Sequence, residues 1–106
     1  ITKLLLKNGA APNTIDYKTK APILYNACND GDLKIADLLI KYKANPNLTD
    51  PNETTTLMVA CSKGYVELAS LLLQNGAEIN RFNKYGESPL LLACIRGDLN
   101  LVKLLA

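Results

Sequence analysis

The sequence predicts an all-α solenoid of stacked helix-turn-helix units that are joined by hairpin-like turns. The first observation is a motif that recurs at constant spacing as "NACNDG", "VACSKG" and "LACIRG", with its cysteine at Cys28, Cys61 and Cys94. The second is the apolar stretch that follows a copy of the motif, as in "LLIKYKANPN" and "LLLQNGAEIN". A fixed period of this kind is the signature of repeat architectures, in which each unit buries its apolar side against its neighbours.

The first element of each unit is expected to be a short helix, as in "TTTLMVACSKG" (54–64). Its threonines suit a helix N-cap, because a hydroxyl oxygen accepts a hydrogen bond from a free backbone N–H of the first turn. Leu57, Ala60 and Cys61 lie three and four residues apart, which places them on one face of a helix. Gly64 is expected to end this helix.

A second helix is expected over "YVELASLLLQN" (65–75), where leucine and other apolar residues form a wide apolar face. Gly76 is expected to end it, because glycine readily adopts the left-handed conformation found after helices. The polar segment "AEINRFNKYGES" (77–88) predicts an extended turn to the next pair. Neither helix is long enough to be stable alone, so the pairs are expected to stack and bury one continuous core.

The composition is typical of a soluble globular protein. Of the 106 residues, 48% are apolar and 21% are charged, and the net charge is +2. The charges are spread evenly along the chain and the apolar runs are far too short to span a bilayer, which argues against nucleic acid and membrane as partners. No signal or transit peptide is recognised, and three cysteines cannot all pair. We therefore expect an intracellular protein, cytoplasmic or nuclear.

Enzyme chemistry is not expected. The chain has no histidine, which removes the usual general base, the usual partner of a catalytic thiol and the commonest zinc ligand. It also has no Gly-rich phosphate loop, no nucleophile elbow and no metal-ligand spacing. We therefore expect no catalytic residue, no cofactor and no metal.

Three stretches carry a resemblance to a known family. They are "APILYNACNDGDLKIADLLIKYKANPN" (21–47), "DPNETTTLMVACSKGYVELASLLLQNGAEIN" (50–80) and "NKYGESPLLLACIRGDLNLVKLL" (83–105). With their constant period, they resemble the ankyrin repeat, whose pattern runs roughly D-x-x-G-x-T-P-L-H-x-A-A-x-x-G and continues into a helix that ends L-L-x-x-G-A-D-x-N. The resemblance implies an ankyrin-repeat solenoid.

One ankyrin array is expected over residues 1–106. Its divisions are a partial repeat at 1–15, repeats at 16–49 and 50–82, and a partial repeat at 83–106. Terminal repeats normally present a polar outer face. Here the end helices would leave apolar residues bare, namely Ile1, Leu4, Leu5, Leu101, Leu104 and Leu105. We therefore interpret the chain as a fragment of a longer array, with flanking ankyrin repeats as its neighbours.

The chain departs from the family pattern at the histidine and at one turn glycine. Tyr25, Met58 and Leu91 replace the histidine, so its hydrogen bonds to the neighbouring turn are expected to be lost. Glu53 stands where Gly86 keeps the turn glycine. A non-glycine residue that is forced to positive φ costs roughly 1 kcal/mol.

Two further departures lie in the first half of the chain. Lys43 replaces the glycine that ends a second helix. The segment 16–22 is one residue longer than its counterpart 50–55, and Pro22 stands one place early, so an irregular turn is expected there.

The three cysteines occupy the same position of the first helix, which is normally alanine in this family. Cys28, Cys61 and Cys94 are therefore expected to be small, buried core residues. Equivalent positions in stacked helices lie roughly 8–10 Å apart, which is too far for a disulfide. The alternatives are a redox-sensitive surface thiol and a catalytic thiol.

The resemblance implies that partner contacts come from the turn tips and from the exposed side of the first helices. A partner-binding role is expected at Arg81, Phe82, Lys84, Tyr85, Glu87, Ile95, Arg96, Asn52, Thr54, Ser62, Lys63, Asn29 and Asp30. Matching positions are also held by Lys18, Thr19, Ala21 and Pro51. In "RFNKY" (81–85) the aromatic residues either contact a partner or lie flat on the adjoining turn as packing.

The expected function is a non-catalytic protein–protein interaction module or scaffold, whose partner protein the sequence does not identify. One alternative is a regulatory ankyrin segment of a larger enzyme, channel or effector. Another is a weak binder of nucleic acid or anionic surfaces through its lysines, which the even charge balance disfavours.

Asparagine recurs at the foot of the turns, as Asn13, Asn47 and Asn80. The structural role expected of these asparagines is a side chain that hydrogen-bonds backbone groups left unpaired at a helix end. A second role comes from resemblance alone: Leu72 lies eight residues before Asn80, like the pattern that an asparaginyl hydroxylase recognises in ankyrin repeats. Asn80 is therefore also a candidate modification site.

Overall fold

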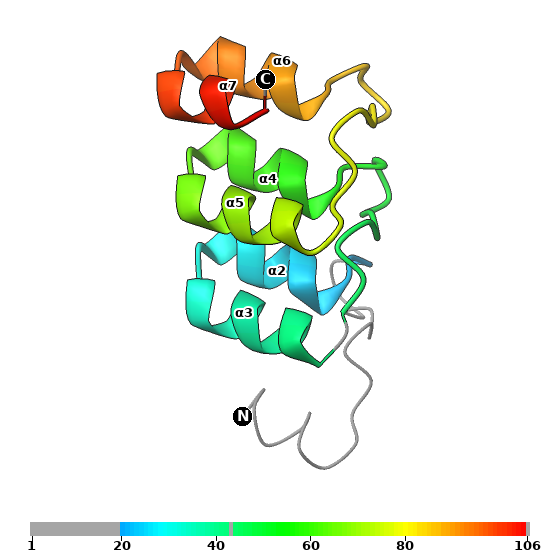
Figure 1. The fold of residues 1–106 in the computed structure, drawn as a ribbon. Helices are drawn as coiled ribbons and strands as arrows, with labels where there is room; N and C mark the ends of the chain where they lie inside the picture. The colour runs from blue at the N-terminus through cyan, green and yellow to red at the C-terminus, as the bar shows by residue number, and fades with distance from the viewer. Residues whose placement is uncertain (1–19, 43, 106) are drawn as a thin grey trace.

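Six α-helices form the described part of the chain. The computed structural model describes residues 20–42 and 44–105. The helices are α2 (Ile23–Asp30), α3 (Leu33–Lys41), α4 (Thr56–Lys63), α5 (Val66–Gln74), α6 (Pro89–Arg96) and α7 (Leu99–Leu105). Figure 1 shows them as three helix pairs stacked one upon another. The prediction of an all-α repeat fold is confirmed.

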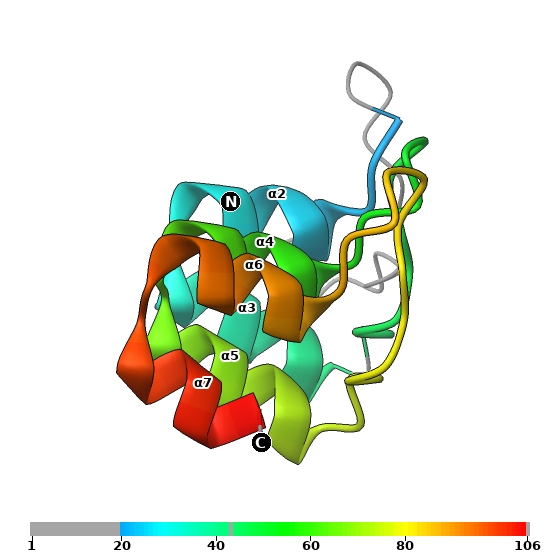
Figure 2. The ribbon, with the colours of Figure 1, turned by 90° about the horizontal axis from the view of Figure 1, so that it is seen from above.

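The helices lie in two layers. The first helices of the pairs, α2, α4 and α6, form one layer, and the second helices, α3, α5 and α7, form the other (Figure 2). The turns that link successive pairs run along one edge of the stack and project past the first-helix layer (Figure 2). The first helices and the projecting turns therefore meet at an angle on one side of the molecule.

Hydroxyl side chains cap the N-termini of α4 and α6, as predicted for the threonines before α4. The hydroxyl oxygen of Thr55 accepts a hydrogen bond from Met58 N at 3.2 Å, and Ser88 Oγ accepts one from Leu91 N at 3.2 Å. Pro22 holds the equivalent position before α2, where it forms no side-chain cap. α2 therefore begins without the cap that stabilises the two later first helices.

The core runs through the whole stack. Equivalent residues of successive units share the same burial, as shown by Ala36 and Ala69, which are both fully buried. Cys28 and Cys61 are also fully buried, as predicted, but the prediction is wrong for Cys94, which is exposed. α6 packs on α4 and covers the face that carries Cys61. No further helix among the described residues covers the same face of α6.

The apolar residues left exposed at the α6 and α7 end of the stack differ from the expected ones. Leu101 is fully buried and Leu105 is nearly so, because α7 turns them toward α5 and α6. Leu104 is exposed, as expected, and so is Leu90 at 42% of its surface. Leu57, the counterpart of Leu90 in the preceding unit, lies under α6 and is fully buried. The expectations for Ile1, Leu4 and Leu5 lie outside the described residues.

The two turns share one hydrogen-bond pattern. Asp50 Oδ1 accepts from the backbone N–H of Asn52 at 2.9 Å and of Thr54 at 3.0 Å. Asn83 Oδ1, at the equivalent position of the next turn, accepts from the N–H groups of residues 85 and 87 at 2.9 and 3.0 Å. Lys84 N also donates to Asn52 O at 2.9 Å. Each turn is therefore closed by one side chain, and the two turns are joined to each other by a backbone hydrogen bond.

Positive φ recurs at one position of the turns. Glu53 has a φ of 63° and Gly86 a φ of 74°, so the expectation of strain at Glu53 is confirmed. Lys20, at the equivalent position one unit before Glu53, has a φ of 61°. Residues 16–19 of the irregular turn expected at 16–22 lie outside the described residues, as does Lys43.

The expected loss of the helix-to-turn hydrogen bond is wrong at Tyr25. Its hydroxyl hydrogen-bonds the carboxylate of Asp50 in the neighbouring turn, so tyrosine keeps a link that the family's histidine would make. Burial, this hydrogen bond and the negative charge of Asp50 together raise the pKa of Tyr25 to about 12. At the equivalent position, Met58 Sδ accepts from Thr55 N at 3.5 Å within its own helix.

The backbone-bonding role predicted for asparagine holds at Asn47 and fails at Asn80. Asn47 Nδ2 donates to Gly76 O at 3.0 Å, and its Oδ1 accepts from Glu78 N at 2.7 Å. Asn80 is exposed, and its side chain forms no hydrogen bond with any described residue. Both partners of Asn47 belong to the following pair.

The substitution Asn47→Ala should lower the free energy of unfolding by about 1–2 kcal/mol, because two hydrogen bonds to backbone groups are lost. Asn80→Ala is the matched control and should change it by less than about 0.5 kcal/mol. Urea unfolding of both variants measures the difference. Equal effects of the two substitutions would contradict the assigned role of Asn47.

Candidate functional site

A shallow hollow lies between the first helices and the turns. It has a volume of about 140 Å³. The hollow is lined by Tyr25, Asn29, Thr54, Met58, Val59, Ser62, Lys63, Asn83, Glu87 and Leu92. We call the hollow, together with the first-helix residues at positions equivalent to its lining, the inner face. These residues come from α2, α4, α6 and both turns, so the hollow exists only because the pairs stack. Among the described residues, every buried side-chain nitrogen or oxygen has a hydrogen-bond partner.

The inner face changes character along the stack. The same three positions of each first helix face this side, because residues three and four apart share one side of a helix. In α2 these positions are polar and hold Tyr25, Asn26 and Asn29. In α4 they are mixed, with Met58, Val59 and Ser62, and in α6 they are wholly apolar, with Leu91, Leu92 and Ile95. Leu91 and Ile95 are 43% and 69% exposed. The apolar part of the inner face is therefore at α6.

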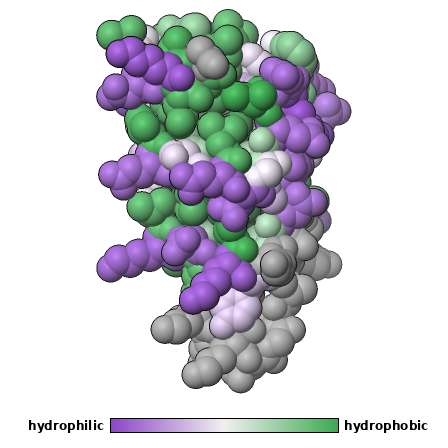
Figure 3. Space-filling view, viewed as in Figure 1, coloured by the Kyte–Doolittle hydropathy of each residue, from purple (hydrophilic) through white to green (hydrophobic). Residues whose placement is uncertain are grey.

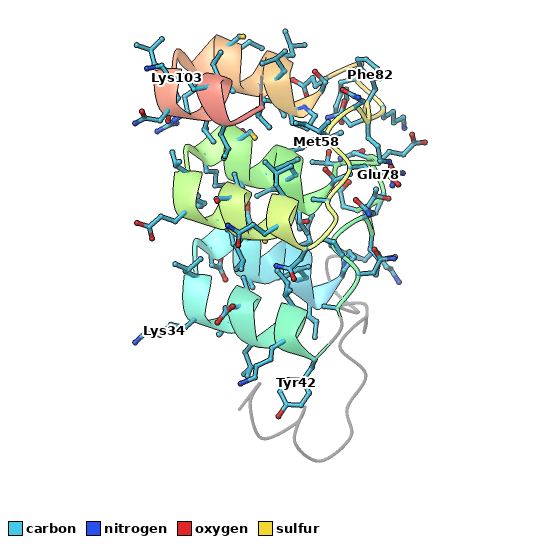
Figure 4. All side chains as sticks on the ribbon, viewed as in Figure 1. Lys34, Tyr42, Met58, Glu78, Phe82 and Lys103 are labelled. Carbon is cyan, nitrogen blue, oxygen red and sulfur yellow. The ribbon has the colours of Figure 1, made fainter. Side chains whose placement is uncertain are left out.

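The turn before α6 carries two exposed aromatic rings. Phe82 is 64% exposed and Tyr85 is 67% exposed. Figure 4 shows Phe82 among the turn side chains, at the edge away from Lys34 and Lys103. Rings with this much exposed surface are little covered by the described turns, which favours the contact interpretation over the packing interpretation. The contact role itself stays a prediction.

Two of the predicted contact residues have structural partners. Arg81 Nη1 donates to Asn47 O at 2.9 Å, and its Nε lies 3.6 Å from Glu78 Oε2. Glu87 Oε1 accepts from Asn83 Nδ2 at 2.9 Å. These side chains help to hold the turns in place, so they are less free to meet a partner than Lys84 and Tyr85.

The other predicted contact residues are distributed as follows. Exposed positions are held by Asn29, Asp30, Pro51, Ser62, Lys63, Phe82, Lys84, Tyr85, Ile95 and Arg96. Asn52 and Thr54 are half-buried. Ala21 was expected to be a contact position, but it is 1% exposed, so this expectation is wrong. Lys18 and Thr19 lie outside the described residues.

Sequence reasoning missed the apolar residues of the inner face. Comparison of equivalent positions across the three units would have revealed Met58, Val59, Leu91 and Leu92. Asn80 is exposed, so its modification stays a prediction.

The chemistry available to the described residues is limited. Burial raises the pKa of the Cys28 thiol to about 12, and burial together with the charge of Asp98 does the same for Cys61. Both thiols therefore stay protonated at neutral pH. Residues 20–42 and 44–105 contain no group of three or more Cys, Asp or Glu side chains that could hold a metal ion. None of their helices has the length and apolar character needed to cross a membrane.

Comparison with known proteins connects this fold to a family. The family model described as ankyrin repeats (3 copies) matches residues 1–83 and 24–106. An ankyrin repeat protein of Rickettsia bellii (strain RML369-C) is 64% identical over 50 residues, which is 47% of this chain and 6% of that protein. Two ankyrin repeat proteins of Acanthamoeba polyphaga mimivirus are 40% and 45% identical over 52 and 58 residues, which is 47% and 54% of this chain. The chain spans 9% and 8% of those two proteins.

Thiol labelling of the native chain should modify Cys94 rapidly and leave Cys28 and Cys61 unmodified, because only Cys94 is exposed. The two buried thiols also react as thiolates, which burial disfavours up to a pH of about 12. Labelling at pH 8 followed by peptide mass analysis, with urea-unfolded chain as the control, measures this. Equal labelling of all three thiols in the folded chain would contradict the assigned core.

Proposed function

Because the chain belongs to the ankyrin repeat family, we propose that it is a non-catalytic protein–protein interaction module or scaffold that holds a partner on its inner face and turn tips. Ankyrin repeats are generally protein–protein interaction modules. The inner face offers a hollow with an apolar side and a polar side, which suits a segment of another protein better than a small molecule.

The observation that carries this proposal is exposed apolar surface that the fold does not require. Phe82, Tyr85 and Ile95 are each about two-thirds exposed. Their equivalents one unit earlier are polar, namely Thr49, Asn52 and Ser62. The repeat is therefore built equally well without these apolar side chains. Aromatic residues at exposed positions are those that most often carry binding energy at interfaces.

Exposed apolar residues on the second-helix side have a different explanation. In Figure 3, which views this side, apolar bands alternate with hydrophilic rows along the stack. Leu99 is 73% exposed there, but its equivalents Leu33 and Val66 are also apolar. A side chain that is apolar in every unit belongs to the repeat itself. This contrast favours the inner face as the contact surface.

Peptides selected on the chain from a random display library should bind at the inner face. Chemical shifts of an isotopically labelled chain should change at Ser62, Leu92 and Ile95. Tyr85→Ala and Ile95→Ala should each weaken binding by about tenfold or more, because both remove apolar contact area at the proposed centre. Their melting temperatures should stay near that of the parent.

Leu99→Ala is the matched control, since Leu99 is as exposed as Ile95 but lies on the other layer. It should leave the affinity unchanged. Shift changes confined to α3, α5 and α7, or a loss at Leu99→Ala as large as at Ile95→Ala, would contradict the proposal.

A further inference from the structure

We propose that the inner face selects an acidic peptide segment that carries a bulky apolar side chain. This inference rests on the proposed function and adds the chemistry of the partner. The apolar side chain would lie against Leu92 and Ile95, and a carboxylate beside it would meet Lys63 and Arg96.

The first step is the position of two cations. Lys63 and Arg96 are exposed and end α4 and α6. The side chain of Arg96 lies directly over Gly64, where a Cβ would stand, and Gly64 follows Lys63 in the chain. The two cations are therefore neighbours at one corner of the inner face. Within residues 20–42 and 44–105, neither takes part in an ion pair or a side-chain hydrogen bond, whereas Arg81 is paired with Glu78.

Among the described residues, no carboxylate near this corner forms an ion pair with Lys63 or Arg96. Asp98 Oδ1 accepts from the backbone N–H groups of Asn100 at 3.1 Å and Leu101 at 3.2 Å, so it caps α7. Glu87 is hydrogen-bonded to Asn83. Asp30 stands one unit earlier, at the end of α2. The same position is therefore held by Asp30, Lys63 and Arg96 in the three units. The positive charge at this position lies toward the α6 end of the stack.

The second step is that the apolar part of the inner face lies at the same end. Ile95 directly precedes Arg96, and Leu92 lies one helical turn before Ile95. Lys63 and Leu92 line the same hollow, whose floor includes the buried side chains of Met58 and Val59. The α6 end of the inner face therefore presents apolar side chains and positive charges next to each other. A segment with only one of the two features would leave the other unused.

The distribution of charge favours such a peptide over nucleic acid. Carboxylates are interleaved with the cations around the turns. Glu87 lies three residues after Lys84, and Glu53 follows Asn52, whose carbonyl oxygen accepts a hydrogen bond from Lys84 N at 2.9 Å. A backbone with a negative charge on every nucleotide would meet these carboxylates as well. A short segment with one or two acids beside an apolar residue meets only the positive corner. Complementary charges of this kind also raise association rates, and salt weakens the attraction.

Three synthetic peptides test the proposal on the full chain. The first has a central leucine and phenylalanine flanked by glutamates, the second has lysine in place of each glutamate, and the third has alanine in place of both apolar residues. Fluorescence anisotropy should show the first binding about tenfold or more tighter than either other peptide. Its affinity should fall as salt rises from about 50 mM to about 500 mM. Equal affinity for the first and second peptides, or for the first and third, would overturn the proposal.

Charge reversal identifies the residues involved. The double variant Lys63→Glu/Arg96→Glu should bind the first peptide with about tenfold or more lower affinity than the parent does. It should bind the second peptide more tightly than the parent does. Lys63→Gln/Arg96→Gln removes both charges without reversing them and serves as the second variant if the reversed one does not fold. It should also bind the first peptide more weakly than the parent does. The matched control is Lys34→Glu/Lys103→Glu, which lies at the edge away from the turns (Figure 4) and should bind as the parent does.

The outcomes separate this inference from the proposed function. If library peptides map to the inner face but the glutamate peptide binds no better than the lysine peptide, the partner chemistry is wrong and the binding surface stands. If the glutamate peptide maps to α3, α5 and α7, both are wrong. A single-stranded oligonucleotide that binds more tightly than the glutamate peptide, and loses affinity in the reversed variant, would also overturn the inference.

Discussion

The packing of one first helix on the next is the constraint on which the rest of the structure depends. Helices as short as these are not stable alone in water, so each pair must bury its apolar side against a neighbour. Leu57, Ala60 and Cys61 are fully buried between α2 and α6. Where no described helix follows, the equivalents Leu90 and Cys94 are exposed. Burial of the leucine and of the cysteine therefore depends on the neighbouring unit, whereas Ala93, the equivalent of Ala60, is fully buried without a further described helix.

Stacking also determines where function can be encoded. The constant period places equivalent residues in columns along the stack, and the turn bonds of Asp50 and Asn83 hold the turns beside the helices. Columns that build the core repeat their residue type. The columns that face the hollow do not, since Asn29, Ser62 and Ile95 occupy one position in three units. Variation in these columns leaves the fold unchanged and is available for recognition.

The helices and the threonine cap of α4 could be predicted because each follows from a local pattern or from the repeat. The exposure of most turn-tip positions could be predicted in the same way, while their contact role stays a prediction. Other features depend on contacts that a linear pattern does not contain. The bond between Tyr25 and Asp50 joins two units, and Asn47 finds its partners in the next pair. Asn80 has the same local sequence signal without those partners. The apolar α6 side of the hollow could have been predicted, because it needs only a comparison of equivalent positions across the units.

Amide hydrogen exchange tests most directly the claim that stability comes from neighbouring units. α4 and α5 lie between two other helix pairs, while α6 and α7 pack on one described pair. Local opening in such arrays is governed by nearest-neighbour contacts. The account predicts that amides of α4 and α5 exchange more slowly than those of α6 and α7. Protection in α6 and α7 equal to or greater than that in α4 and α5 would contradict it.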